Sequence, residues 1–359
     1  MGTDRRPDPV DLDAVLALDD FEPLARPRLP AVVHDYVAGG AWDEVSLAGN
    51  VAAWQRRTLH PRVLVDVRRT STATTLLGRP AAMPVAIAST AAHRDLHPDG
   101  ELATARAAAA AGVPLMLSTF SSYPLEEVAA AAPAGARWFQ LYLQSDPGRS
   151  RDLVERAAAA GFEALVVTVD SPVLGYRQRE RRHAPIEPDR SPLDVPDADG
   201  RSPVVPGGVT PRLTWDDLAT LRDWAPGLPV VLKGILRADD ARLAVEHGAD
   251  AIVVSNHGAR QLDRVPAPAD VLEEIAAAVA GHCEIWVDGG VRRGLDVVTA
   301  LALGARGVLV GRPVLWALAA GGEAGVARAL AILREETELA LALLGCPRVD
   351  DVARDRVRP

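Results

Sequence analysis

Short runs of apolar, largely β-branched residues alternate along the middle of this chain with longer alanine-rich segments. Eight such runs lie between residues 83 and 313, and their length and composition predict buried strands. The segments between them, such as 98–112 and 237–248, repeat apolar residues at helical spacing and end in glycine, which is typical of helices. The predicted strands are Pro84–Ser89, Pro114–Thr119, Trp138–Leu143, Ala164–Asp170, Pro229–Gly234, Ala251–His257, Glu284–Gly289 and Gly307–Gly311.

Eight consecutive β–α units with continuously apolar strands predict a closed parallel (β/α)8 barrel of the TIM type. An open doubly wound sheet is the alternative. The predicted organisation is a single domain in which 1–82 precede the barrel, 83–313 form it and 314–359 close the chain with helices. The N-terminal segment includes helical stretches at Ala31–Ala38 and Trp42–Gln55, and the C-terminal helices begin at Val314 and at Glu323. Residues 171–228, rich in Pro, Arg and Asp, read as a lid or binding loop between strands four and five.

Composition narrows the class of protein. The chain has 359 residues, 48% of them hydrophobic, which is enough for one large α/β domain or two ordinary ones. A net charge of −9 provides no general field that would favour nucleic acid or an anionic membrane. The two cysteines do not make a disulfide framework, and Cys283 reads as a small core residue. We find no secretory h-region and no stretch that reads as a bilayer span, so we expect a cytoplasmic protein.

The most informative string is AIVVSNHGARQLD at residues 251–263, where a buried strand ends in polar residues. In a barrel, chemistry collects at the carboxyl ends of the strands. His257 and Arg260 place a titratable base beside a permanent cation. That pair suits a substrate whose carboxylate adjoins a carbon or oxygen that must lose a proton. The structural alternative is a strand end followed by a turn with a solvated arginine.

The other strand ends are also polar or glycine-rich. A buried Lys233 needs an anionic partner, because an isolated ammonium in the interior is costly. The ends in order are Ser89-Thr90-Ala91, Ser118-Thr119-Phe120, Gln140-Leu141-Tyr142, Thr168-Val169-Asp170, Lys233-Gly234, Ser255-Asn256-His257, Asp288-Gly289-Gly290 and Gly311-Arg312. Their convergence on one rim predicts an active site there.

The last two strand ends have the character of a phosphate site. In DGGVRRG the backbone N–H groups of Gly289 and Gly290 can face an anion, with Arg292 behind them, and GRPV adds Gly311 and Arg312. Alternatively, these glycines only make tight turns. No Gly-x-Gly-x-x-Gly follows a strand and no P-loop occurs, which disfavours a Rossmann-bound dinucleotide. His93 and His97 are four residues apart without an evident third ligand, so we expect no metal site.

With these residues identified, the chain resembles the FMN-dependent (S)-2-hydroxy-acid oxidase and dehydrogenase family, which includes glycolate oxidase, lactate oxidase and monooxygenase, mandelate dehydrogenase and hydroxymandelate oxidase. The resemblance runs from about Pro30 to the C-terminal helix. It rests on SNHGARQLD, joined by LKGIL, DGGVRRG, LVGRP, QLY and TVDSP, and on LPAVVHDYVAGG and WDEVSLAGN near the N-terminus. It implies a (β/α)8 barrel, bound FMN, oxidation of a 2-hydroxy acid to the 2-keto acid, and a homotetramer.

The resemblance also implies roles for individual residues. His257 would take the substrate proton, with Asp170 holding its ring and Tyr142 hydrogen-bonding the substrate hydroxyl. Arg260 and Arg177 would clamp the carboxylate with help from Tyr36, and Phe120 would form part of the pocket wall. Lys233 would face the flavin N1 region, where a cation stabilises negative charge. The remaining implied flavin contacts are Ser89, Thr90, Ala91, Ser118, Gln140, Thr168 and Ser255, with Asp288 on the ribityl chain and Gly290, Arg292, Gly311 and Arg312 on the phosphate.

Departures from the family pattern bear on the substrate. Ser89-Thr90-Ala91 stands where Pro-Thr-Ala is usual, and Phe120 stands where plant glycolate oxidases carry Trp. Phe120, Leu174 ahead of Arg177 and a proline-rich lid indicate an apolar pocket. The stretch HPDGELA and the alanine-rich C-terminal half resemble the actinobacterial mandelate and hydroxymandelate oxidase type. We therefore expect an aryl or medium-chain substrate, with lactate or glycolate as alternatives.

The identity of the electron acceptor is predicted from a single residue, Ala91, at which members of the family differ. Ala91 matches the small residue of the oxidases, whereas the monooxygenase and mandelate dehydrogenase members tend to carry Gly, and this favours O2 with release of H2O2. A quinone- or dye-linked dehydrogenase is the alternative within the family. A degenerate flavin-binding barrel that serves as a scaffold is the non-enzymatic alternative, although every catalytic position is filled.

Overall fold

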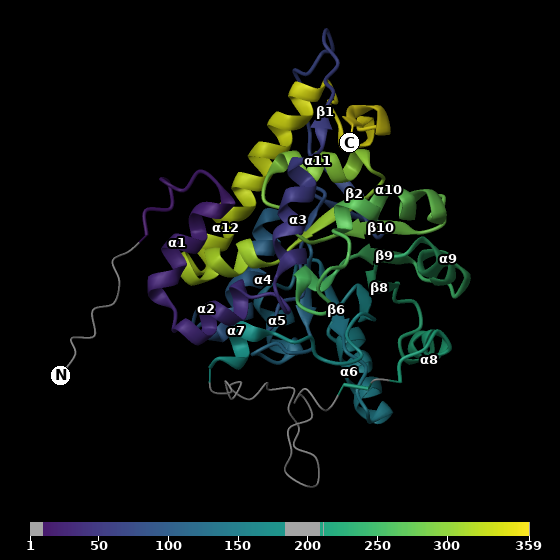
Figure 1. The fold of residues 1–359 in the computed structure, drawn as a ribbon. Helices are drawn as coiled ribbons and strands as arrows, with labels where there is room; N and C mark the ends of the chain where they lie inside the picture. Colours follow the sequence, from purple (N-terminus) through teal and green to yellow (C-terminus); the bar gives the residue numbers. More distant parts are fainter. Residues whose placement is uncertain (1–9, 184–208, 211, 359) are drawn as a thin grey trace, which may run out of the picture.

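Eight parallel strands close into a barrel in the computed structural model, which describes residues 10–183, 209–210 and 212–358 (Figure 1). The hydrogen-bonded order is β10-β11-β4-β5-β6-β7-β8-β9, so the predicted (β/α)8 barrel is confirmed and the open sheet is excluded. The strands are β4 Val85–Ile87, β5 Leu115–Ser118, β6 Arg137–Leu141, β7 Ala164–Thr168, β8 Val230–Ile235, β9 Ala251–Val254, β10 Glu284–Val287 and β11 Gly307–Val310.

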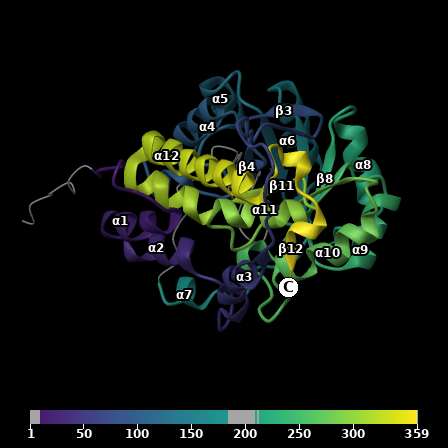
Figure 2. The same cartoon turned by 90° about the horizontal axis from the view of Figure 1, so that it is seen from above.

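A helix follows each strand and packs outside it, and the ring of helices is visible from above in Figure 2. These helices are α4 Gly100–Ala111, α5 Leu125–Ala131, α6 Pro147–Ala159, α8 Asp217–Trp224, α9 Ala238–Glu246, α10 Pro268–Val279, α11 Gly294–Ala302 and α12 Arg312–Leu344. Helix α8 packs on α6 and therefore belongs to this outer layer. The lid predicted at 171–228 is thus too broad, because its C-terminal part is the helix of the fourth β–α unit.

Both faces of the strands are buried, which explains their continuously apolar sequences. In β7, Ala164 and Val166 point into the barrel, whereas Leu165 and Val167 pack against the helices. Inside the barrel, the indole rings of Trp138 and Trp286 meet edge to face with centroids 4.9 Å apart. The barrel interior is therefore a packed core, which leaves the rim at the carboxyl ends for chemistry.

A hairpin that the sequence analysis did not predict covers the opposite end of the barrel. Strands β2 Thr74–Leu76 and β3 Arg79–Ala81 pair antiparallel, and Leu76 is buried in the interior cluster. The backbone N–H of Leu77 donates to the carboxylate of Glu284 at the start of β10, which fixes the hairpin to the amino-terminal ends of the strands. The expected helical segment 1–82 is thus partly β-structure. A second short pair joins β1 Thr58–Leu59 to β12 Val357–Arg358.

The N-terminal helices α1 Phe21–Ala25, α2 Ala31–Ala38 and α3 Val45–Gln55 precede the barrel. Helix α3 begins at Val45 rather than at Trp42, because Trp42 and Glu44 have left-handed backbones with φ of 47° and 61°. Its amino terminus is capped from far along the chain, since the Asp263 carboxylate accepts from the backbone N–H groups of Ser46 and Val45. Asp263, at the end of the motif that follows β9, therefore also holds α3 against the site.

Helix α12 runs beside α4 and α11 and is long and apolar enough to cross a membrane by length and composition alone. The sequence analysis did not mark such a span. Two thirds of the apolar window is buried, and non-helical backbone at Gly321 and Gly322 divides the helix near the predicted boundary. These are features of a core helix of the barrel. Cys283 is half-buried and packs against the edge of the core, where the sequence analysis expected a small core residue, and Cys346 is buried.

Candidate active site

The imidazole of His257 and the carboxylate of Asp170 form the centre of the site. Asp170 lies just beyond β7 and His257 just beyond β9, and His257 Nδ1 lies 2.8 Å from Asp170 Oδ1. Ser171 donates its hydroxyl hydrogen to the same Oδ1 at 2.9 Å. A carboxylate at Nδ1 favours the tautomer with the proton on Nδ1, which leaves Nε2 as the acceptor. His257 Nε2 lies 3.2 Å from the hydroxyl oxygen of Tyr142.

Burial and neighbouring charges set the protonation of this pair. Burial lowers the pKa of His257 below its ordinary value, and although Asp170 opposes the shift, Lys233 and Arg177 add to it. Burial alone would raise the pKa of Asp170, but the charge and hydrogen bond of His257 and the charge of Lys233 hold it below its ordinary value. The result at neutral pH is a neutral imidazole beside a carboxylate, an arrangement that can accept a proton at Nε2 and stabilise the imidazolium.

Aromatic rings line the space beside Nε2. The ring of Phe120 lies 5.1 Å from that of Tyr142, and the Tyr142 ring stacks near His257 at 6.4 Å. Burial raises the pKa of Tyr142, with a further contribution from Asp170, so its phenol stays protonated and can donate a hydrogen bond. This side of the site therefore combines one hydroxyl donor with an apolar wall.

Two arginines form a cationic clamp beside the aromatic wall. The guanidinium of Arg260 lies over the ring of Tyr36 at 4.8 Å and donates from Nη1 to the Tyr36 and Gly39 carbonyls. Arg177 donates from Nε to the carbonyl of Arg260 at 3.1 Å. Burial lowers the pKa of Arg177, and the positive charge of Arg260 lowers it further. Two guanidinium groups held this close favour an anion between them.

A belt of polar side chains crosses the carboxyl ends of neighbouring strands. Gln140 Nε2 donates to Thr168 Oγ1 at 2.9 Å and its Oε1 accepts from the hydroxyl of Ser118 at 3.3 Å. Further along, Lys233 Nζ lies 3.0 Å from both Ser255 Oγ and Asp288 Oδ2. Burial alone would lower the pKa of Lys233, but Asp288 and Asp170 hold it above its ordinary value, so Lys233 is a buried ammonium. The sequence analysis expected an anionic partner for Lys233 without naming one, and the structure identifies it as Asp288.

The predicted phosphate residues gather at the ends of β10 and β11. Arg312 is half-buried and donates to the carbonyls of Val37, Gly39 and Gly258, without an ion pair to a carboxylate among the described residues. Burial lowers its pKa to about 9, and the nearby charges of Arg260 and Arg292 contribute. The side chain of Arg292 instead meets Asp19 of the N-terminal segment, Nε to Oδ1 at 3.1 Å.

The loop after β4 holds Ser89, Thr90 and Ala91 next to this region. The methyl group of Thr90 would lie 3.5 Å from a Cβ at Gly311, which places the two predicted contacts side by side. Thr90 Oγ1 also lies 2.8 Å from His93 Nε2, and His93 Nδ1 lies 3.0 Å from Thr104 Oγ1. His93 is therefore engaged with hydroxyl groups behind the loop.

The sequence analysis assigned no role to Gln261 and Asn256, although both lie in the string 251–263, and it did not identify Asn50. Gln261 accepts from the backbone N–H of Gly175 at 3.1 Å and donates to the carbonyls of Val173 and Asp170, so it ties the segment after β7 to the motif after β9. The amides of Asn256 and Asn50 exchange two hydrogen bonds of 2.7 and 2.9 Å. The sequence shows that Asn256 lies in a polar strand end, which could have marked it as a site residue. It gives no sign that Asn50 is the partner of Asn256.

Gly234 and Gly290 are required by close approaches. At Gly234, with φ of +118°, a Cβ would lie 2.6 Å from the Cβ of Asp170, and at Gly290, with φ of +85°, it would lie 2.3 Å from the carbonyl oxygen of Asn50. The first glycine lets Asp170 reach His257. The second brings the turn after β10 against α3.

The fold and the site together define a class: a (β/α)8 barrel whose rim carries a buried proton acceptor, a two-arginine anion clamp and a second cationic end suited to a phosphate. The chain matches the family described as FMN-dependent dehydrogenase over residues 25–359, and it belongs to that family.

Similar proteins agree with this membership. The chain is 48% identical to an L-lactate oxidase from a Nostoc species, with 95% of this chain and 97% of the relative covered. It is 45% identical to human 2-hydroxyacid oxidase 1, with 97% of each chain covered. Among solved structures, a mandelate oxidase described with (S)-2-phenylpropionate superimposes with a TM-score of 0.87 at 46% identity, covering 96% of this chain and 98% of that chain. The protein is an FMN-dependent oxidase of 2-hydroxy acids.

The residues present fit FMN. Asp288 Oδ1 is buried and has no hydrogen-bond partner among the described residues, as expected of an acceptor for a ribityl hydroxyl. Arg312 is a half-buried cation that has no carboxylate partner in the part of the chain that the structure describes, as expected of a phosphate ligand. The belt from Ser118 to Thr168 and the Lys233 ammonium can meet the polar edge of the flavin ring.

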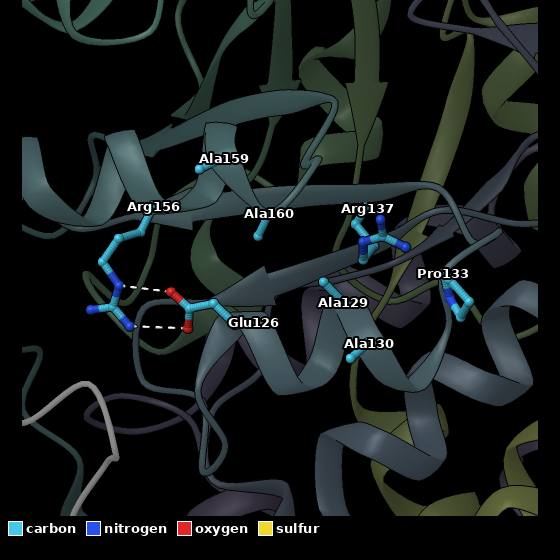
Figure 3. Close-up of a pocket in the computed structure, with 8 residues that line it drawn as sticks. All are labelled: Glu126, Ala129, Ala130, Pro133, Arg137, Arg156, Ala159 and Ala160. Carbon is cyan, nitrogen blue, oxygen red and sulfur yellow. Dashed lines mark hydrogen bonds and ion pairs between the residues drawn. The ribbon is translucent and has the colours of Figure 1, made fainter.

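A separate hollow of about 510 Å³ lies between α5 and α6, toward the amino-terminal end of β6. Figure 3 shows Glu126 and Arg156 paired across its mouth and Arg137 at its far side. Its remaining lining is almost entirely alanine: Ala129, Ala130, Pro133, Ala159 and Ala160. Because β6 delivers Gln140 and Tyr142 to the rim at its other end, this hollow is not part of the site.

Proposed function

We propose that this enzyme oxidises (S)-2-hydroxy acids whose side group is aryl or of medium length, and that molecular oxygen is its electron acceptor. One observation carries the proposal: the acceptor nitrogen of His257 faces Tyr142 and the aromatic wall, while the Arg260–Arg177 clamp lies beside them. A 2-hydroxy acid has the complementary parts, namely a carboxylate, an adjacent hydroxyl and a side group.

His257 Nε2 takes a proton from the substrate, and Asp170 stabilises the resulting imidazolium through Nδ1. Arg260 and Arg177 hold the carboxylate and thereby orient the carbon that carries the hydroxyl, and Tyr142 donates to the hydroxyl oxygen. FMN, when bound, supplies a two-electron acceptor. Lys233 places a cation at the belt, where the family resemblance places flavin N1. The same arrangement serves hydride transfer or carbanion formation.

The balance of the reaction is simple. The substrate loses two electrons and two protons as its C–H and O–H bonds break, and the product is the 2-keto acid. Oxygen receives two electrons and two protons and leaves as H2O2. Ala91 on the loop after β4 supports oxygen as acceptor, and the relatives compared above carry names of oxidases.

The apolar wall supports the larger substrate. Phe120 packs on Tyr142, and Leu174, ahead of Arg177, is half exposed on the segment after β7. Burial of a phenyl ring gains on the order of 2 kcal/mol, which separates two substrates by more than tenfold. Overall identity does not separate the candidates, since the lactate oxidase is 48% identical and the mandelate oxidase 46%.

We expect (S)-mandelate or (S)-2-hydroxyoctanoate to exceed lactate and glycolate by at least about tenfold in kcat/KM, because only the former pair fills an apolar wall. The measurement is a panel of these four acids under air, with peroxide and keto acid quantified together. A tenfold advantage of glycolate or lactate would contradict the apolar pocket and leave the flavin chemistry intact. Slow reoxidation of the reduced enzyme by oxygen, together with fast turnover with a quinone or dye, would contradict the proposal that oxygen is the electron acceptor.

We also propose that the protein is a homotetramer, as the family resemblance implies. Val63, Leu64, Leu339 and Leu343 are exposed, and the segment 62–65 lies against the end of α12, near the top of Figure 1, because Arg62 donates its N–H to the Leu344 carbonyl. An apolar patch of this kind is a typical subunit contact.

Sedimentation velocity should give a tetramer for the wild type and a smaller species for Leu64→Glu or Leu343→Glu, because a charge would be buried at the contact. Leu16→Glu, at an exposed leucine in the N-terminal segment, is the matched control and should keep the wild-type size. A monomeric wild type would refute the assembly.

A further inference from the structure

Glu180 lies on the short helix α7 Gln178–Arg181 and meets both arginines of the clamp. Its Oε1 is 2.9 Å from Arg260 Nη2 and 3.6 Å from Arg177 Nη1. The three side chains are largely buried, with exposed fractions of 26% for Glu180 and 14% for each arginine. Helix α7 packs against α2, which carries Tyr36, and the two helices lie side by side at the lower left of Figure 1. Glu180 is thus a fixed part of the clamp.

The contacts of Arg260 leave room for a substrate while Glu180 remains in place. A guanidinium carries five N–H donors. Nη1 of Arg260 donates to the Tyr36 and Gly39 carbonyls, and one hydrogen of Nη2 donates to Glu180. Within the described part of the chain, Nε–H and the second Nη2–H have no partner. Nε and Nη2 share one edge of the guanidinium, and this is an edge at which arginine binds a carboxylate in fork geometry.

The neighbouring acidic side chains already have partners of their own. Asp170 pairs with His257, Asp35 with His183 at 2.7 Å, and Glu44 with Arg179. The charge at the clamp is therefore two arginines less Glu180, a net charge of +1. That charge is balanced by a single substrate carboxylate.

We propose that Glu180 is a specificity-determining residue that holds the clamp at a net charge of +1, so that the site accepts monocarboxylates and rejects dicarboxylates such as a 2-hydroxy diacid. This inference rests on the proposed function for its substrate class. A second carboxylate on the substrate would add a negative charge to a partly buried site that already holds the Glu180 carboxylate, where repulsion is stronger than in water. The discrimination comes from repulsion and needs no further contact.

The test compares two non-oxidisable probes of the same shape, succinate and succinamate, which differ by one charge. Their Kd values are measured on the FMN-loaded enzyme from the change in flavin absorbance. We expect the wild type to bind succinamate at least about tenfold more tightly than succinate, and Glu180→Gln to reduce that preference to within about threefold. In turnover, the preference for (S)-malamate over (S)-malate should fall by the same factor.

Two further variants separate charge from shape. Glu180→Asp keeps the charge and should keep the preference, even if its shorter side chain weakens both probes. Glu126→Gln removes an equally ion-paired carboxylate, 2.8 Å from Arg156 at the hollow of Figure 3, and should leave the preference unchanged. A wild type without preference overturns the proposal, as does a Glu180→Gln variant that keeps it or a Glu180→Asp variant that loses it.

Failure of this inference is distinguishable from failure of the proposed function. The probe titrations need bound FMN and an intact clamp but no turnover. An enzyme that shows the predicted Kd ratios and oxidises no 2-hydroxy acid would refute the function and support the role of Glu180. An enzyme that turns over (S)-malamate and (S)-malate equally well would support the proposed function and refute the role of Glu180.

Discussion

Replacement of His257 by alanine should leave FMN bound and slow the reduction of the flavin by substrate about 10³- to 10⁴-fold. A positioned general base contributes roughly 10²- to 10⁴-fold, and Asp170 is left without the proton acceptor that it orients. FMN content is read from the absorbance of the purified variant, and the reduction rate from anaerobic stopped-flow mixing with substrate.

The pH profile of the wild type gives the same prediction a second readout. The base is competent when neutral, and burial lowers its pKa. Activity as kcat/KM should therefore fall as the pH decreases through a midpoint below the ordinary histidine value of about 6.5. His247→Ala is the matched control, because this exposed histidine of the α9–β9 turn lies away from the rim. Normal flavin reduction in His257→Ala would refute the assignment of the base.

Replacement of Gly234 by alanine should cost both stability and catalysis. The residue has φ of +118°, and the added Cβ would lie 2.6 Å from the Cβ and 2.7 Å from the Cγ of Asp170. Asp170 must shift, and a displacement of about 1 Å in a catalytic group can cost on the order of 100-fold in rate. The expected results are a kcat lower by about 100-fold and an unfolding free energy lower by about 3 kcal/mol, measured by steady-state assay and chemical denaturation.

Gly227→Ala isolates the backbone contribution. Gly227 also has a positive φ, of +89°, but no atom lies within 4 Å of the Cβ position. It should lose only about 1 kcal/mol of stability and keep its kcat. Equal catalytic losses in the two variants would show that backbone strain, and not the displacement of Asp170, is responsible.

The barrel could be predicted because its strands are buried on both faces. That burial produces continuous β-branched runs such as Ala251–Val254, which a local reading recognises. The hairpin at Thr74–Ala81 could not be predicted in the same way, because its strands have three residues each and its burial comes from covering the barrel end. The start of α3 was misplaced because its cap, Asp263, lies more than 200 residues away.

In the candidate site, too, some features could be predicted from the local sequence and others depended on contacts between distant residues. Polar residues at successive strand ends were visible in the sequence, and parallel closure brings them to one rim whatever the side-chain details. The partners of these residues were not visible. Nothing local indicates that Lys233 pairs with Asp288, that Asn50 pairs with Asn256, or that Glu180 bridges Arg177 and Arg260.

The sequence by itself determined the eight β–α units, the identity of the residues at their ends and the resemblance to FMN-dependent 2-hydroxy-acid oxidases. Those properties are encoded in short patterns, because strand burial and motif chemistry act over a few neighbouring residues. Only the tertiary structure decided which charges meet, how much of each is buried and where a glycine is required by a close approach. These depend on the closure of the barrel, which places groups from distant units within 3 Å of one another and outside the reach of any local pattern.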